Sequence, residues 1–203
     1  MKILCIGRNY ADHAKELKND LPTEPVIFMK PKSALLLPEK PIYYPDFTKD
    51  LQFECELVVK IVKNGKFIAE KFAHKYYNSV SLGIDFTARD VQREQQKKGL
   101  PWEIAKAFDG SAATGTFVPL TELKPIMDLD FELKLNGNTV QIGHTRDMIF
   151  NIDQIIAYAS RYFTFNVGDL LFTGTPAGVG PVKIDDKLEG FLEGKKVLDV
   201  DVK

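Results

Sequence analysis

The sequence predicts a β-rich α+β fold with many short strands and a few short helices. Strand patterns occur along the whole chain, whereas helical patterns are confined to three segments, which is not the pattern of a doubly wound parallel sheet. No repeat, low-complexity tract or linker-like stretch interrupts the 203 residues. We therefore expect a single domain over residues 1–203.

The first helix is expected over Ala11–Leu17, and the polar, turn-prone segment Asn19–Pro25 after it would suit the hinge of a lid. A strongly apolar strand is predicted over Phe53–Val62. The dipeptide Asn64–Gly65 follows it and favours the positive φ angles of a tight hairpin. Together these patterns predict a strand that turns back on itself.

The second helix is expected over Thr87–Lys98. Thr87 would be its N-cap, Asp90 lies in its first turn, and residues 99–101 (Gly-Leu-Pro) would end it.

Two further strands are predicted by alternation. Phe131, Leu133 and Leu135 alternate with charged residues, and Asn136–Gly137 would turn the chain into a partner strand at residues 139–142.

The last two elements are a helix and a terminal strand. The helix is expected from Ile152 to about Tyr162, where Asn151 and Gln154 have the spacing of a capping box. The strand at residues 198–202 alternates apolar and acidic side chains, so one of its faces is expected to be buried.

Composition argues against several classes of partner. The formal net charge is −1, and no dense Lys/Arg stripe would favour nucleic acid or an anionic membrane surface. No window approaches the roughly 20 apolar residues of a membrane span, and the apolar stretch at the N-terminus is too short for a signal-peptide core. Cys5 and Cys55 are isolated, so a reduced, cytoplasmic setting is expected.

Three carboxylates form a candidate metal site. On a strand, Glu54 and Glu56 share one face, while Phe53, Cys55 and Leu57 share the other. Asp85, at the end of an apolar run, is a candidate third ligand. A solvated strand face is the ordinary explanation of a Glu-x-Glu pattern, and a metal site competes with it.

Oxygen ligands select a hard cation. Mg²⁺ or Mn²⁺ in octahedral geometry would leave three positions for water or substrate. Cys55 is expected to be a small buried hydrophobe pointing away from this face, which disfavours zinc.

Several motifs then resemble those of the fumarylacetoacetate hydrolase superfamily, in the family's order. They occupy residues 7–13, 54–56, 83–92, 98–106 and 174–180. The length and the segment from residue 7 to 16 look most like the compact acylpyruvate hydrolase and oxaloacetate decarboxylase branch. The resemblance implies a mixed β-roll, a homodimer, and Mg²⁺ on Glu54, Glu56 and Asp85, with a 2-keto acid substrate chelating the metal.

The resemblance also assigns catalytic roles. His13 and Glu16 are three residues apart, so a helix would place them on one face, and the family uses the matching pair to activate water. Lys106 would stabilise developing enolate charge. Without the resemblance, a solvated helix face and a surface lysine would be the ordinary interpretations.

Five more residues are candidates for substrate binding. Gln92 matches a family position that hydrogen-bonds substrate or regulates decarboxylation. Arg89 lies one turn before it and could be structural or could pair with a carboxylate of the pocket. The remaining candidates are Arg8, Lys30 and the hydroxyl of Thr175 in a glycine-rich loop that lacks the ending of a P-loop. His74 and His144 are expected to be structural.

The expected activity is metal-assisted carbon–carbon bond cleavage in a small anionic 2-keto acid. Hydrolysis of an acylpyruvate and decarboxylation of oxaloacetate would both give a pyruvate enolate. One alternative is isomerase or decarboxylase action on 2-hydroxydienedioates. Another is a catalytically silent, metal-bound ligand-binding scaffold.

Overall fold

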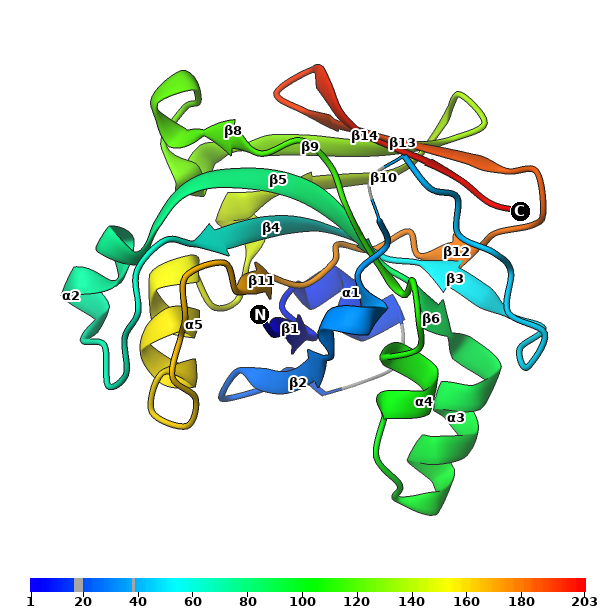
Figure 1. Cartoon of the computed structure of the whole chain (residues 1–203), viewed down its shortest axis with the longest axis horizontal. Helices are drawn as coiled ribbons and strands as arrows, with labels where there is room; N and C mark the ends of the chain where they lie inside the picture. The colour runs from blue at the N-terminus through cyan, green and yellow to red at the C-terminus, as the bar shows by residue number, and fades with distance from the viewer. Residues whose placement is uncertain (17–19, 38) are drawn as a thin grey trace.

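The structure is a computed structural model that describes residues 1–16, 20–37 and 39–203 (Figure 1). Its largest sheet has seven strands, with β1 and β11 parallel and the other pairs antiparallel. In spatial order the strands are β2 (Val26–Lys30), β1 (Ile3–Gly7), β11 (Leu170–Phe172), β4 (Cys55–Ile61), β5 (Tyr77–Asp85) and β7 (Ala112–Thr114), with β8 (Val118–Pro119) also paired to β5.

Two smaller sheets adjoin it. The four-stranded sheet has the order β10 (Asn138–His144), β9 (Asp130–Leu135), β13 (Lys187–Leu192) and β14 (Lys195–Asp201). The three-stranded sheet has the order β12 (Gly180–Pro181), β3 (Leu51–Phe53) and β6 (Thr87–Ala88). These sheets with few helices confirm the β-rich α+β fold.

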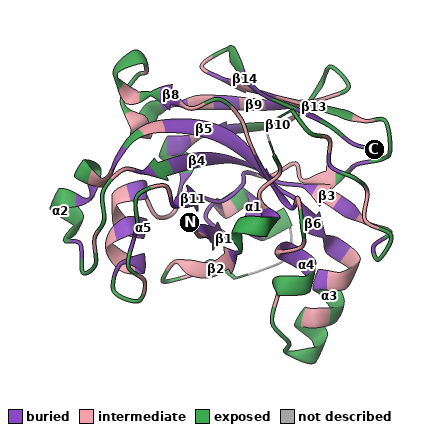
Figure 2. Cartoon of the chain, in the orientation of Figure 1, coloured by how far each residue is buried: buried purple, intermediate pink, exposed green. Residues whose placement is uncertain are grey.

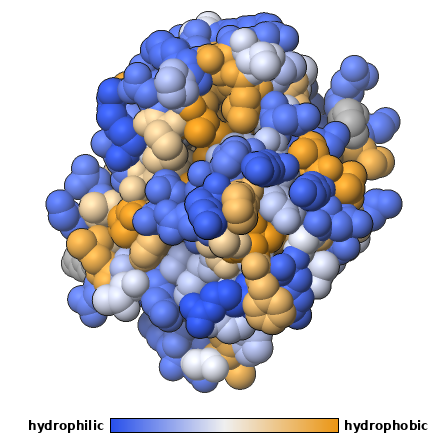
Figure 3. Space-filling model, turned by 90° about the vertical axis from the view of Figure 1, so that its left-hand side faces the viewer, coloured by the Kyte–Doolittle hydropathy of each residue, from blue (hydrophilic) through white to orange (hydrophobic). Residues whose placement is uncertain are grey.

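The helices are short (Figure 1). They are α1 (Ala11–Glu16), α2 (Glu70–Ala73), α3 (Arg89–Lys98), α4 (Glu103–Lys106) and α5 (Ile152–Ala159). Single 3₁₀ turns occur at Lys32–Ala34, His74–Tyr76, Leu120–Glu122, Ile126–Asp128 and Thr145–Asp147. Among the described residues, no helix has the length and apolar character to cross a membrane. The end that carries α2 and α5 exposes hydrophobic groups scattered among hydrophilic ones (Figure 3).

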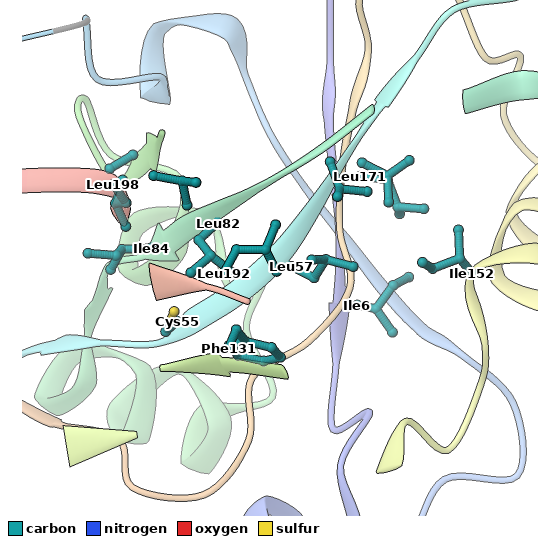
Figure 4. Packing of buried hydrophobic residues seen from close by; sticks show 14 of the residues in the cluster. Ile6, Cys55, Leu57, Leu82, Ile84, Phe131, Ile152, Leu171, Leu192 and Leu198 are labelled. Atoms are coloured by element: carbon teal, nitrogen blue, oxygen red, sulfur yellow. The ribbon is translucent and has the colours of Figure 1, made fainter. Parts of the chain in front are cut away.

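The hydrophobic core lies between β4–β5 and the sheet of β9, β13 and β14. Figure 2 shows the central strands almost entirely buried. Leu57 and Leu82 from the large sheet and Phe131, Leu192 and Leu198 from the smaller sheet belong to one cluster (Figure 4). Cys55 joins this cluster, as the alternation of its strand predicted. The opposite side of this part of the chain is therefore free to carry Glu56, in β4, and Glu54, directly before it.

Three local predictions are confirmed. Asn136 and Gly137 have φ angles of 51° and 81°, as a hairpin turn with two positive φ values requires, and they join β9 to β10. The capping box of Asn151 and Gln154 is complete at the start of α5. The terminal segment buries Leu198, Val200 and Val202 and exposes Asp199 and Asp201, which alternate with them.

The predicted hairpin at Asn64–Gly65 is wrong. Gly65 instead forms an antiparallel bridge with Phe165, and the chain passes through α2 before returning as β5. Gly65 is needed for packing, because a Cβ there would lie 2.3 Å from the ring of Tyr76. The predicted strand over Phe53–Val62 is in fact two strands, because β3 pairs with β6 and β12 whereas β4 pairs with β5 and β11.

The helix boundaries also differ from the predictions. Thr87 is not an N-cap, because Thr87–Ala88 pair with β3 as β6 and the helix begins at Arg89. Asp90 in the first turn and Gly99 in the left-handed conformation at the end are as predicted. Helix α5 ends at Ala159, three residues before the predicted Tyr162. Leu17 and Asn19, at the predicted end of the first helix and start of the hinge, lie outside the described residues.

Candidate active site

Strand register brings the three predicted carboxylates together. Cys55 pairs with Ile84, and Glu56 pairs with Gly83, so Glu54 comes opposite Asp85. The Asp85 N–H donates to the Glu54 carbonyl at 2.9 Å, and Glu54 is the residue between β3 and β4. Each carboxylate has an oxygen within 4.8 Å of the others, and all three side chains are buried.

Three cations surround two of these carboxylates. The Lys106 ammonium donates to Glu54 Oε2 at 2.8 Å and to Asp85 Oδ2 at 2.9 Å. The Arg89 guanidinium donates to the other oxygen of Glu54. Lys30 Nζ lies 2.7 Å from Asp85 Oδ1 as an ion pair outside hydrogen-bond geometry. Both oxygens of Glu54 and both oxygens of Asp85 therefore lie beside a cationic side chain.

Glu56 has a different environment. Its carboxylate accepts a 2.7 Å hydrogen bond from the Gly174 N–H, and it forms no ion pair with any described residue. Burial, together with the charges of Asp85 and Glu54, raises the pKa of Glu56 well above its ordinary value. Burial alone would also raise the pKa of Glu54, but the Lys106 ammonium and Arg89 guanidinium hold it well below the ordinary range.

This arrangement fits a hard divalent cation. The donor set is carboxylate oxygen only, and Glu56 places a buried carboxylate with a raised pKa beside two others, where a cation would relieve like-charge repulsion. Glu54, Glu56 and Asp85 are the residues that would hold it.

Backbone geometry explains how Gly174 reaches Glu56. β1 and β11 are parallel, so their carboxyl ends meet at one edge of the sheet. Gly174 has a φ of +99°, and a Cβ there would lie 2.6 Å from Cβ of Asn9. Only glycine fits this close crossing of the two chain segments.

His13 lines the same cavity, and Glu16 lies next to His13. His13 Nδ1 is 3.1 Å from Glu16 Oε2, His13 is buried, and Glu16 remains partly open to solvent. The Gly178 N–H donates to Glu16 Oε1 at 3.1 Å, which connects α1 to the glycine-rich loop. The helix predicted from residue spacing therefore brings the pair together.

The cavity collects most of the predicted substrate-binding residues. Arg8, Gln92 and Thr175 line it together with the three carboxylates, His13 and Lys106. Arg89 also lines it and donates to Gln92 Oε1 at 2.7 Å, so it orients Gln92 as well as Glu54.

Lys30 has a different position from the predicted one. It does not line the cavity but lies behind Asp85, where its ammonium donates to the carbonyls of Phe86 and Ser111 and to the Ser111 hydroxyl. It holds a carboxylate in place and cannot reach a ligand in the cavity. His74 is exposed, and His144 pairs with Asp130 on the surface, so both lie away from the site.

Sequence reasoning missed Gln141. This side chain is buried and accepts from the Cys55 N–H at 2.9 Å, while its amide donates to Thr175 Oγ1 and to the Pro176 carbonyl, both at 2.9 Å. It therefore joins the backbone between the two glutamates to the glycine-rich loop. Its single signal in the sequence is a polar residue between Val140 and Ile142, which is too weak to find it.

A family model described as "Fumarylacetoacetate (FAA) hydrolase C-terminal" matches residues 2–203. Human "Oxaloacetate tautomerase FAHD1, mitochondrial" is 44% identical over 192 residues, which cover 95% of this chain and 87% of the human protein. The corresponding protein of Caenorhabditis elegans is 40% identical over 194 residues, covering 96% of this chain and 91% of that protein.

Two solved structures are also similar to this chain. Fumarylpyruvate hydrolase from Pseudomonas aeruginosa, in complex with Mn²⁺ and pyruvate, superimposes with a TM-score of 0.92 at 35% identity, covering 100% of this chain and 89% of that one. A 2-hydroxyhepta-2,4-diene-1,7-dioate isomerase from Mycobacterium marinum superimposes with a TM-score of 0.85 at 33% identity. The match covers 99% of this chain and 73% of that one.

Proposed function

The chain belongs to the fumarylacetoacetate hydrolase family, and we propose that it hydrolyses acylpyruvates, small anionic 2-keto acids, to pyruvate and a carboxylic acid. The observation that carries this proposal is the 3.1 Å distance between Glu16 Oε2 and Nδ1 of His13, which lines the cavity that contains the acidic triad. Hydrolysis needs an activated water molecule, and this pair is suited to produce one.

Mg²⁺ is the proposed cofactor, with Mn²⁺ able to replace it, bound by Glu54, Glu56 and Asp85. Such an ion would supply Lewis-acid polarisation of the 2-oxo-carboxylate end of the substrate. The Pseudomonas aeruginosa relative was solved in complex with Mn²⁺ and pyruvate, which supports a divalent cation as cofactor and a 2-keto acid as ligand.

The residues of this chain would divide the reaction between them. Glu16 accepts a proton from water while His13 orients its carboxylate, and the resulting hydroxide adds to the acyl carbonyl carbon. The carbon–carbon bond then breaks, and its electron pair passes to the pyruvate enolate. Lys106 stabilises that negative charge, and the proton that Glu16 took from water passes to the enolate carbon, which completes pyruvate.

The remaining cavity residues would bind the substrate. Arg8 and the Thr175 hydroxyl offer a cation and a donor to the carboxylate. Gln92, held by Arg89, would hydrogen-bond the substrate's oxygen atoms. Lys30 would act indirectly, by fixing Asp85.

Oxaloacetate is the second candidate substrate, because the human and nematode relatives are named oxaloacetate tautomerases. Decarboxylation would give the same pyruvate enolate as hydrolysis, whereas tautomerisation would give the enolate of oxaloacetate itself. Both are enolates of a 2-keto acid, so one electrostatic arrangement would serve them. Decarboxylation needs no activated water, which separates it from hydrolysis. The isomerase alternative is favoured by the Mycobacterium marinum relative and needs room for a longer dianion. Homodimeric assembly and a cytoplasmic location remain predictions.

The test measures pyruvate release from acetylpyruvate and from oxaloacetate, with Mg²⁺ and with chelator, for wild type and Glu54→Ala. We expect metal-dependent release that the variant loses. If neither substrate yields pyruvate although the metal is bound, the proposal is rejected in favour of dienedioate isomerase activity. If the protein is also inactive on dienedioates, the catalytically silent scaffold is left.

A further inference from the structure

A groove adjoins the active-site cavity on the side of β2. It runs between the edge strand β2 and the segment that enters α4, and it holds about 570 Å³ of free space including its open mouth. Because β2 is the last strand of its sheet, no described strand covers this side of it.

The groove and the cavity share three lining residues. Phe28, Trp102 and Lys106 line both, and the rings of Phe28 and Trp102 are 5.6 Å apart between centroids. Lys106 Nζ is 5.3 Å from the Phe28 ring centroid and 2.9 Å from Asp85. The groove therefore begins within one side chain of the carboxylates that would hold the metal.

Most of the residues that line the groove are apolar. Val26, Ile27, Met29 and Pro101 add hydrocarbon surface to the two aromatic rings. Glu103 is exposed and brings a negative charge to the same groove. Apolar walls favour hydrocarbon, and a carboxylate at the mouth repels a second carboxylate on the ligand.

We propose that this groove binds the acyl chain of the substrate and selects acylpyruvates with an extended hydrocarbon chain over those that end in a carboxylate. The proposal rests on the proposed function for the place of the 2-keto acid end, which would occupy the cavity beside Lys106. To the proposed function it adds the class of acyl group that is preferred, an extended hydrocarbon chain.

Trp102 gives a direct measurement of binding, because it is the single tryptophan of the chain and lines the groove. Its fluorescence is titrated, in the presence of Mg²⁺, with 2-oxobutanoate, 2-oxohexanoate and 2-oxooctanoate. We expect each added methylene to tighten binding roughly two- to fourfold, since a fully buried CH₂ contributes about 0.8 kcal/mol and 1.4 kcal/mol is tenfold. Affinity independent of chain length would overturn the proposal.

Charge at the mouth is tested with a matched pair of ligands, 2-oxohexanoate and 2-oxoadipate, which differ at the last carbon. Wild type should prefer 2-oxohexanoate. Glu103→Lys should shift the affinity ratio toward 2-oxoadipate by roughly three- to tenfold, and Glu103→Gln by less. A ratio unchanged in Glu103→Lys would contradict the assignment.

Glu70→Lys is the matched control. Glu70 is exposed and is the first residue of the four-residue helix α2, just as Glu103 is the first residue of the four-residue helix α4. Helix α2 lies at the opposite end of the molecule from α4 (Figure 1). It should leave the ratio unchanged, and a shift equal to that of Glu103→Lys would show a general charge effect and reject the groove.

Turnover separates this proposal from the proposed function. Chain-length-dependent binding without pyruvate release from acetyl- or hexanoylpyruvate would reject the hydrolase and retain the groove. Equal pyruvate release from both substrates, with affinity independent of chain length, would retain the hydrolase and reject the groove.

Discussion

The ammonium group of Lys30 lies 2.7 Å from Oδ1 of Asp85, and neither side chain is exposed to solvent. Lys106 takes the other oxygen of the same carboxylate, so Asp85 is fixed between two lysines from different segments. This pair links the edge strand β2 to the end of β5. The placement of a proposed metal ligand therefore depends on a residue outside the cavity.

Replacing Lys30 should cost stability. Lys30→Met leaves Asp85 buried with one cation fewer, and breaking a buried ion pair typically costs about 3–5 kcal/mol. We expect the free energy of unfolding in urea to fall by that amount, against less than about 0.5 kcal/mol for Lys32→Met at an exposed neighbouring position. Equal effects of the two substitutions would show that the pair is not stabilising.

Glu56 should decide metal affinity. Glu56→Gln preserves the shape of the side chain but removes the charge that no described cation neutralises. We expect Mn²⁺ affinity, measured by calorimetry, to fall by roughly 100-fold or more, since even indirect partners of metal ligands change affinity by about 10- to 100-fold. Glu122→Gln, at an exposed position, is the control. Unchanged Mn²⁺ binding in Glu56→Gln would remove Glu56 from the metal site.

Gln141 should be needed for the position of the glutamate strand. Gln141→Leu leaves the buried Cys55 N–H without its acceptor, which costs about 1–3 kcal/mol of stability. Gln141→Glu keeps an acceptor for Cys55 and loses the donor to Thr175, so it should retain more stability. Thermal unfolding of the two variants measures the difference, and a more stable leucine variant would contradict the assignment.

Asp169 should make stability dependent on acid pH. Burial alone would raise the pKa of Asp169, but hydrogen bonds from the side chain and backbone of Lys2 and from the Asn166 N–H lower it. The folded-state pKa is therefore below the unfolded value of about 3.9, so the stabilisation is present above that value and is lost as pH falls through the folded-state pKa.

Asp169→Asn tests this dependence. It should lower stability by about 1–3 kcal/mol at pH 7 and flatten the pH dependence of unfolding below about pH 4. Asp185→Asn, at an exposed position, should leave that dependence nearly unchanged. An equally steep acid transition in Asp169→Asn would contradict the assignment.

Much of the site followed from residue spacing and strand geometry. The alternation around Cys55 placed Glu54 and Glu56 on one face and Cys55 in the core, as the structure has them. The three-residue spacing of His13 and Glu16 gave a pair on one helix face. These relationships are local, so a period of two or of about 3.6 residues is enough to predict them.

Long-range partners could not be read from the same patterns. Asn64–Gly65 has the composition of a hairpin, but packing against Tyr76 and pairing with Phe165 decide its conformation. Thr87 has the composition of an N-cap, but pairing with Gln52 makes it part of a strand. In both places tertiary contacts override a local preference.

Gln141 shows the same limit within the site. Strict alternation would bury Val140 and Ile142, yet an irregularity between Thr139 and Gln141 changes the register of β10 against β9. As a result Ile142 is 61% exposed and Gln141 is 2% exposed. A bulge of this kind has no reliable sequence signature.

The most direct test of the central claim is pyruvate release from acetylpyruvate by Glu16→Gln in the presence of Mg²⁺, with oxaloacetate decarboxylation measured in parallel. Glu16 would activate water, so we expect hydrolysis to fall by about 10²- to 10⁴-fold while decarboxylation stays within about tenfold of wild type. Hydrolysis unaffected by the substitution, or equal losses of both reactions, would contradict the assignment of Glu16 as the base that activates water.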